Sequence, residues 1–185
     1  MRSTSIFYTF TFFHRLAMGA TCTLYIPWLV AIGLSFSQIA LLNAIFWTST
    51  ILLELPTGML ADGRGRGFSV TMGALFWGLG GLFYSTVTGF PGAMMAEITL
   101  SLGAAFISGA LSAWIADAKD RKEPLRKVYA TATFLGGLAM IVSPLLAVMI
   151  TQVTFPSAFW VMEGSLALIA SFVAWRFMMS NEPEH

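Results

Sequence analysis

Long apolar runs separated by short polar breaks are the dominant pattern of this chain. A membrane-spanning helix needs roughly 20 apolar residues. Six runs reach or approach that length, at about 6–32, 37–55, 68–87, 93–115, 128–150 and 157–178. Glycine, proline and charged residues stand at the breaks, where they favour turns. The runs do not alternate polarity in short segments as barrel strands would. The pattern predicts an all-α, polytopic membrane protein with six transmembrane helices.

The composition agrees with that prediction. Of 185 residues, 57% are hydrophobic and only 10% are charged, whereas soluble domains carry about 25% charged residues. The polar surface is too small for a protein in water, so we expect membrane lipids to surround the chain. A single cysteine, Cys22, excludes a disulfide framework and a cysteine-based metal site.

The basic residues predict the orientation in the membrane. Three connecting segments, 31–38, 85–94 and 151–159, contain no charged residue. Of the ten basic residues, all except Arg15 lie in the other connections or near the two ends of the chain. Because lysine and arginine concentrate on the cytoplasmic side, we expect both termini in the cytoplasm and an inner (plasma) membrane location.

The charged turn GMLADGRGRG, residues 58–67, interrupts two apolar runs. Small residues allow two helices to turn tightly and to approach each other closely. We place Asp62 at the start of the third helix, where the positive end of the helix dipole favours an acid. Arg64 and Arg66 can reach a cytoplasmic carboxylate, and Asp117 is the natural partner. The simpler alternative is a solvated turn whose arginines only follow the charge rule.

This turn resembles the loop between the second and third helices of the major facilitator superfamily, which reads in outline G-x-x-x-D-[RK]-x-G-R-[RK]. The positions that match are Gly58, Asp62, Gly65 and Arg66. Gly63 and Gly67 depart from the pattern, since the family prefers basic residues there. Two further stretches, 33–62 and SGALSAWIAD at 108–117, are similar to drug-efflux and tetracycline-exporter relatives in that family.

The resemblance implies half of a twelve-helix transporter, arranged as two inverted three-helix repeats in a single domain, 1–185. In the family, the substrate site lies between two such halves, so we expect a second six-helix half, from a copy of this chain or from another chain. The family's cytoplasmic cluster latches the outward-facing state. The residues that correspond here are Gly58, Asp62, Arg64, Gly65, Arg66 and Asp117.

The length of the chain is equally consistent with a truncated product or an excised domain. It is also consistent with a structural or assembly subunit of a larger membrane complex, which keeps the fold for protein contacts and does not transport. The sequence leaves these alternatives open beside the half-transporter.

Ionisable residues inside the apolar runs mark functional positions by default, because a charge in the membrane is costly. Arg15, beside His14, lies roughly 12 to 14 Å from the cytoplasmic boundary at the helical rise of 1.5 Å per residue. Glu97 and Glu163 lie nearer to the outer boundary. Glu54 matches the depth of Arg15 better, so we expect it to be a structural charge partner.

The resemblance implies a cavity lined by the first and fourth helices, which would place His14, Arg15, Glu97 and Thr99 along a substrate or proton pathway. Glu97 or Glu163 could carry a proton that drives export of a small molecule. The alternative is that Arg15 snorkels to the inner headgroups and that both acids reach the outer interface. Many proton-coupled exporters carry an arginine where Thr99 stands, so the coupling ion stays open.

Three aromatic residues, Tyr25, Trp28 and Trp160, fit an outer interfacial belt better than a pocket for an aromatic substrate. Enzymatic activity is not expected, since the chain has no nucleophile–base pair and no metal-spaced His, Cys or Asp cluster. The GRGRG segment lacks the Gly-Lys-Ser pattern of a nucleotide-binding loop. We therefore predict no catalytic residues, no cofactor, no metal and no nucleic-acid partner.

Overall fold

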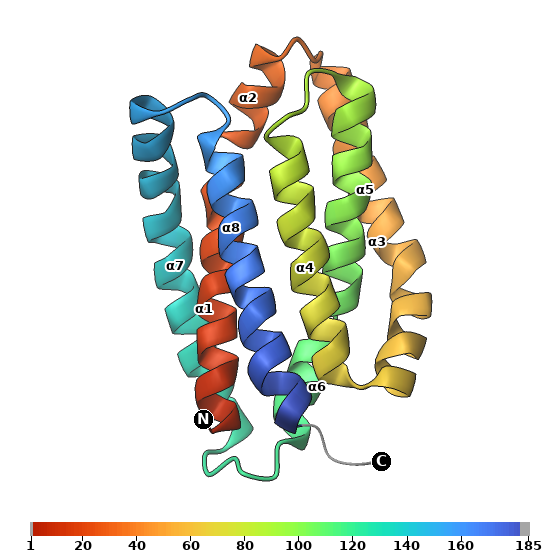
Figure 1. Ribbon diagram of the computed structural model, residues 1–185, viewed down its shortest axis with the longest axis vertical. Helices are drawn as coiled ribbons and strands as arrows, with labels where there is room; N and C mark the ends of the chain where they lie inside the picture. The colour runs from red at the N-terminus through yellow and green to blue at the C-terminus, as the bar shows by residue number, and fades with distance from the viewer. Residues whose placement is uncertain (1, 182–185) are drawn as a thin grey trace.

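The helices of the computed structural model, which describes residues 2–181, run roughly parallel to one long axis (Figure 1). No strand occurs in this part of the chain. The elements are α1 (Ser3–Thr21), α2 (Tyr25–Ala31), α3 (Phe36–Arg64), α4 (Arg66–Tyr84), α5 (Phe90–Ile107), α6 (Ala110–Asp117), α7 (Leu125–Val153), α8 (Ala158–Val173), the π turn η1 (Ala174–Met178) and the 3-10 turn η2 (Met179–Asn181).

Five helical stretches within the described residues are long and apolar enough to cross a membrane. They are Phe36–Arg64, Arg66–Tyr84, Phe90–Asp117, Leu125–Val153 and Ala158–Met178. Helix α1 falls outside this group, because hydroxyl residues, His14 and Arg15 dilute its apolar run. The prediction of an all-helical membrane protein is confirmed, with five candidate spans among the described residues, while the sixth span stays a prediction.

The first predicted helix, 6–32, is not continuous. It stops at Thr21 and resumes as α2 at Tyr25. Pro27 supplies the reason, because proline has no N–H for the residue four positions earlier and its ring clashes with that carbonyl. The same proline is tolerated in the first turn of α2, where an N–H has no intrahelical partner.

The second predicted helix was expected to end before Pro56, but α3 continues past that residue to Arg64. The chain turns instead at Gly65, whose φ of 96° is a conformation that glycine adopts at low cost. Asp62 therefore lies in the last turn of α3. Our placement of Asp62 at the start of the next helix, and its stabilisation by that helix dipole, were wrong.

A second break divides the fourth predicted helix into α5 and α6. The chain bends at Ser108 and Gly109, and Gly109 has a φ of 75°. This break matters for function, because Ser108 lines a pocket between the helices.

The long helices pack as a row of neighbours in the order α7, α1, α8, α4, α5, α3 (Figure 1). Glycines allow the inner helices to approach closely. An added Cβ at Gly103 of α5 would lie 2.7 Å from the carbonyl oxygen of Gly73 in α4, and one at Gly164 of α8 would lie 2.8 Å from that of Gly78. Helices α3 and α7, at the ends of the row, are the least buried of the apolar stretches.

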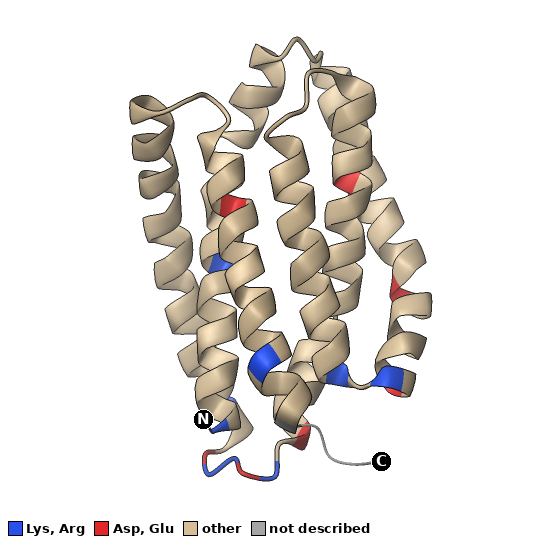
Figure 2. Ribbon diagram, in the orientation of Figure 1, with Lys and Arg blue, Asp and Glu red and all other residues tan. Residues whose placement is uncertain are grey.

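Most of the basic positions gather at one end of the helices, the end at which α1 begins (Figure 2). Helix α8 and the turns η1 and η2 finish at the same end (Figure 1). A positive-inside protein concentrates its basic residues on the cytoplasmic side, and the orientation of this chain in the membrane stays a prediction.

Candidate functional site

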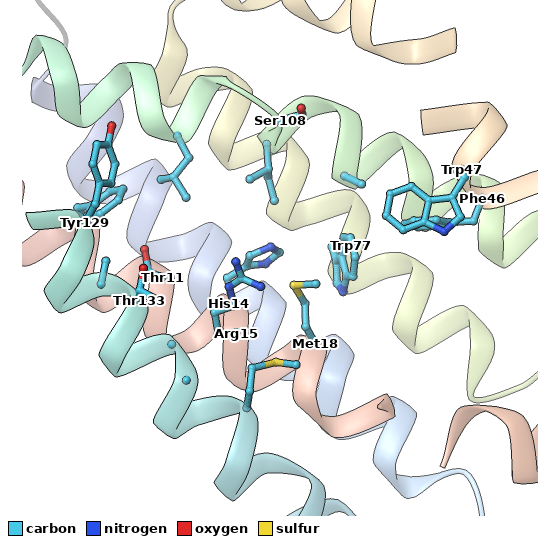
Figure 3. A pocket seen from close by; sticks show the side chains of 18 residues that line it. Thr11, His14, Arg15, Met18, Phe46, Trp47, Trp77, Ser108, Tyr129 and Thr133 are labelled. Atoms are coloured by element: carbon cyan, nitrogen blue, oxygen red, sulfur yellow. The ribbon is translucent and has the colours of Figure 1, made fainter. Parts of the chain in front are cut away.

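A pocket of about 750 Å³ lies between helices from the two ends of the row. Helices α1 and α7 form one wall, α3 and α5 form the other, and a side chain of α4 reaches in between them. Figure 3 shows the side chains that line it, among them Thr11, His14, Arg15, Met18, Phe46, Trp47, Trp77, Ser108, Tyr129 and Thr133. The lining is mostly apolar with a few polar groups, which is typical of small-molecule sites.

Arg15 is exposed in this pocket and forms no ion pair with the residues that the structure describes. Its aliphatic stem packs against Gly136 of α7, where an added Cβ would come within 3.0 Å of the Arg15 Cγ atom. Glu54, which we expected as its partner, instead accepts a hydrogen bond from the Ser108 hydroxyl at 3.0 Å. That expectation was wrong because α1 and α3 belong to opposite walls, so matching depth did not bring the two charges together.

His14 is buried, with 8% of its surface exposed. Its ring stacks on Phe10 at 5.6 Å between centroids and meets Trp77 edge-on at 5.4 Å. The Nδ1 atom has no hydrogen-bond partner within the described chain. The imidazole therefore forms part of the pocket wall, and its Nδ1 atom is available for a hydrogen bond.

Glu163, on α8, is 1% exposed. One carboxyl oxygen, Oε1, accepts a hydrogen bond from the indole Nε1 of Trp77 at 2.9 Å. The other oxygen, Oε2, has no partner in residues 2–181. Because Trp77 also lines the pocket, this indole connects the pocket with a buried carboxyl group.

Glu97, on α5, is also buried but does not line the pocket. The hydroxyls of Tyr25 and Tyr84 both donate to its Oε1, at 2.5 and 2.7 Å. The Tyr84 ring stacks on Trp160 with centroids 4.1 Å apart. Glu97 thus forms the polar centre of an aromatic cluster made by α2, α4, α5 and α8.

This cluster corrects two expectations: the interfacial belt of aromatic residues, and the placement of Glu97 along the cavity. Trp28 and Trp160 are buried, and Tyr25 packs against Trp160, so these residues do not form an interfacial belt. The tertiary structure needs an acceptor for two enclosed tyrosine hydroxyls, and Glu97 supplies it. Thr99 lies outside both the pocket and the cluster. Its hydroxyl donates to the carbonyl of Met95 in its own helix at 2.9 Å.

Comparison with known proteins places the chain in a family. Residues 7–185 match the Major Facilitator Superfamily. The chain belongs to the major facilitator superfamily. The resemblance inferred from the charged turn is thereby confirmed, while the drug-efflux branch stays a prediction. Membership of this superfamily supports a transport function and favours a transporter over an enzyme.

Two relatives of this superfamily are similar to most of the chain. An uncharacterised MFS-type transporter of Bacillus subtilis, YxaM, is 30% identical over 135 residues, which cover 71% of this chain and 34% of the relative. An uncharacterised MFS-type transporter of Methanocaldococcus jannaschii, MJ1560, is 25% identical over 175 residues, covering 93% and 45%. The chain thus spans less than half of the length of each.

The superfamily's charged turn joins α3 to α4 here. Arg66 forms an ion pair with Asp117 at the end of α6, and its Nη1 atom also donates to the carbonyl of Ala113 at 3.1 Å. Arg64 instead places its guanidinium 5.4 Å from the centre of the Phe68 ring. One of the two arginines therefore links α4 to the end of α6, and the other covers an aromatic side chain.

The structure explains one departure from the superfamily pattern. Gly67 lies directly against the turn η1, since an added Cβ would meet the backbone carbon of Met178 at 2.8 Å. A basic side chain has no room there. Gly58 and Asp62 are both exposed, and the Asp62 carboxylate makes no ion pair among the described residues.

The sequence did not identify Trp77, Phe46, Trp47 and Tyr129 as pocket residues. Aromatic residues make up 14% of the chain, so their presence on an apolar helix carries no local mark of function. Only the arrangement of α3, α4 and α7 around the pocket distinguishes these four from the others.

Proposed function

We propose that this chain forms one half of a secondary transporter for small molecules, and that the pocket between its two walls is one half of the substrate site. The observation that carries the proposal is Arg15, which lies in a pocket of an apolar bundle without an ion pair among the described residues. Ionisable residues are retained inside membranes mainly where they serve a substrate or ion pathway.

The packing order supports a transporter half built from two inverted repeats and six spans, with α1 and α2 together forming the first. In chain order, the row α7, α1, α8, α4, α5, α3 consists of spans 5, 1, 6, 3, 4 and 2. Exchanging span 1 with span 4, span 2 with span 5 and span 3 with span 6 gives the same row in reverse order. A pseudo-twofold relation between repeats produces this order.

A second half would complete the pocket along the exposed edges of α3 and α7. Large apolar side chains project there, including Trp47 and Leu55 on α3 and Phe134 and Leu145 on α7. We propose that the partner is a second copy of this chain or another six-helix half. The greater length of the two relatives is consistent with a larger transport unit.

The connection through Trp77 supports coupling of export to protons, with Glu163 as the carrier. A carboxyl group that keeps one oxygen unpartnered can take up a proton without breaking its bond to the indole. Because Trp77 also lines the pocket, a substrate that moves this ring would change the surroundings of Glu163.

At the charged turn, the Arg66–Asp117 pair supports a latch that closes the cytoplasmic end. We propose that this end faces the cytoplasm and that the membrane is the inner (plasma) membrane, since the basic residues gather there (Figure 2).

Accessibility of the pocket from the two sides tests transport without knowledge of the substrate. In native membranes, Thr133→Cys in a Cys22→Ser background would be labelled with a membrane-impermeant thiol reagent in right-side-out and inverted vesicles. Thr133 lines the pocket and is exposed. Alternating access predicts labelling from both sides. The control, Leu79→Cys on α4 outside the pocket, should be labelled from neither.

Labelling of Thr133→Cys from one side only, or from neither, would contradict a transporter. Native mass spectrometry of the full chain in nanodiscs gives the second test. A homodimer or a one-to-one pair with another six-helix chain supports the proposal. A chain found only among unrelated subunits would indicate a structural subunit of a membrane complex.

A further inference from the structure

We infer that the pocket binds an organic anion with a flat apolar body, whose charged group pairs with Arg15 and whose body lies against the aromatic wall. The inference rests on the proposed function, because it names the substrate class of the same pocket. Four observations support it: the charge of the pocket, a threonine hydroxyl without a partner among the described residues, the space kept for Arg15, and the arrangement of the rings.

The charge of the pocket is positive. Arg15 is the only residue with a permanent charge among the described residues that line it. Both ion pairs found in residues 2–181, Arg66–Asp117 and Lys127–Glu123, lie elsewhere. Two acids each lie one hydrogen bond away from this lining: Glu54 accepts from Ser108 on the other wall, and Glu163 accepts from the Trp77 indole. A guanidinium without a carboxylate is a preferred partner for a carboxylate, sulfonate or phosphate group.

A threonine also lines the pocket on the side of Arg15. Thr11 precedes Arg15 by one helical turn, so both side chains lie on the same face of α1. Its Oγ1 atom is buried and has no hydrogen-bond partner in the part of the chain that the structure describes. An anion with two or three oxygens can accept from both residues, as Figure 3 shows them on the same side of the pocket.

The neighbouring helix of the same wall, α7, leaves space for this arrangement. Gly136 of α7 accommodates the stem of Arg15, since an added Cβ would lie 3.0 Å from the Arg15 Cγ atom. The next residue, Gly137, also lines the pocket, and an added Cβ there would meet nothing within 4 Å. Two consecutive residues without side chains therefore keep the guanidinium accessible from the pocket.

The rings form a corner suited to a planar group. Phe46 and Trp77 meet with an interplanar angle of 84°, and His14 meets Trp77 at 81°. Aromatic rings attract further rings in edge-to-face and offset-stacked arrangements. A compound of one or two fused rings can pack against this corner while its anionic group extends to Arg15.

The test compares three naphthalene compounds of the same shape and different charge. Naphthalene-2-sulfonate, naphthalene-2-sulfonamide and 2-naphthyltrimethylammonium would be titrated onto the full chain in nanodiscs by calorimetry. We expect the sulfonate to bind at least tenfold more tightly than the other two. Arg15→Gln should abolish that preference, Arg15→Lys should retain part of it, and Arg176→Gln should leave it unchanged.

A second variant probes the space beside Arg15 without altering a charge. Gly136→Ala should displace the arginine stem and weaken sulfonate binding more than sulfonamide binding. Tighter binding of the cation, or sulfonate binding that Arg15→Gln does not change, would overturn the inference. An acid that reaches Arg15 from the second half would produce the latter result.

The outcomes separate this inference from the proposed function. Arg15-dependent sulfonate binding with one-sided labelling of Thr133→Cys would establish the anion site and refute transport. Two-sided labelling without Arg15-dependent binding would leave the transporter intact and refute the substrate class.

Discussion

Two buried glutamates of this bundle have different surroundings, and the contrast separates structure from function. Glu97 accepts hydrogen bonds from two tyrosine hydroxyls inside an aromatic cluster. Glu163 accepts a hydrogen bond from the Trp77 indole, the Thr21 side chain lies near its carboxyl group, and its Oε2 atom has no hydrogen-bond partner among the described residues. The donor of Glu163 lines the pocket, whereas the donors of Glu97 do not. A carboxyl group that holds a cluster together is tied to stability, and one whose indole donor also lines a pocket is tied to the ligand.

The largest effect that this contrast predicts is on stability at Glu97. Glu97→Leu removes the acceptor of Tyr25 and Tyr84 and leaves two buried hydroxyls unpaired. Each orphaned buried donor costs about 1–3 kcal/mol, so we expect a loss of about 2 to 6 kcal/mol. Reversible unfolding in mixed detergent would measure it. Thr99→Val in the same helix is the control and should change the free energy of unfolding far less.

At Glu163 we expect the opposite pattern, a small change in stability and a large change in coupling. Glu163→Gln keeps an amide oxygen for the Trp77 indole but cannot exchange a proton. In liposomes containing a pH-sensitive dye, proton movement on addition of naphthalene-2-sulfonate should fall at least tenfold, while sulfonate affinity stays within a factor of three. The matched variant Glu54→Gln should couple normally. Unchanged proton movement in Glu163→Gln would contradict the assignment.

Trp77→Phe sharpens the contrast, since it keeps an aromatic ring in the pocket and removes the N–H group that reaches Glu163 together with part of the indole. The lost hydrogen bond contributes about 0.5–1.5 kcal/mol, and the smaller ring also loses packing contacts, so we expect a loss of stability above that range. Proton movement per bound sulfonate should also fall. Trp47→Phe alters a pocket indole for which no contact to Glu163 is found in the described chain, so it should preserve the coupling. Equal behaviour of the two variants would refute a special role for Trp77.

The smallest effect on stability is expected at the charged turn, far from both acids. Arg66→Gln breaks the ion pair with Asp117, and exposed pairs contribute about 0–1 kcal/mol. Thiol labelling of Thr133→Cys from the side of the charged turn should nevertheless increase, because the proposed latch would open more often. Arg64→Gln, which removes the contact with Phe68 and no ion pair, should not change the labelling. A rise in both variants would indicate a general charge effect.

Much of the fold could be predicted from the sequence. Apolar runs of membrane-spanning length and the distribution of basic residues reflect constraints that act on each helix separately, through its contact with lipid and with the two surfaces. The boundaries were less predictable. Pro27 broke a helix that we expected to be continuous. Pro56 did not end a helix as we expected, since α3 continues past it to Arg64.

The candidate site was predicted only in part. His14 and Arg15 could be singled out because charged and polar residues are rare in apolar helices. The partners could not be found in the same way. Glu54 matched the depth of Arg15 but belongs to the other wall, and Tyr25 looked like an interfacial residue although its hydroxyl binds Glu97.

The sequence by itself therefore determined that this chain is an α-helical membrane protein of the major facilitator type, since hydropathy and a local turn motif do not depend on neighbouring helices. Only the tertiary structure decided which polar groups meet. It brought Trp77 to Glu163 and the tyrosines to Glu97, and it left Arg15 in the pocket with no ion pair among the described residues. The physical reason is that contacts between helices depend on their rotation and packing, which glycine contacts such as those of α4 with α5 and α8 define in three dimensions.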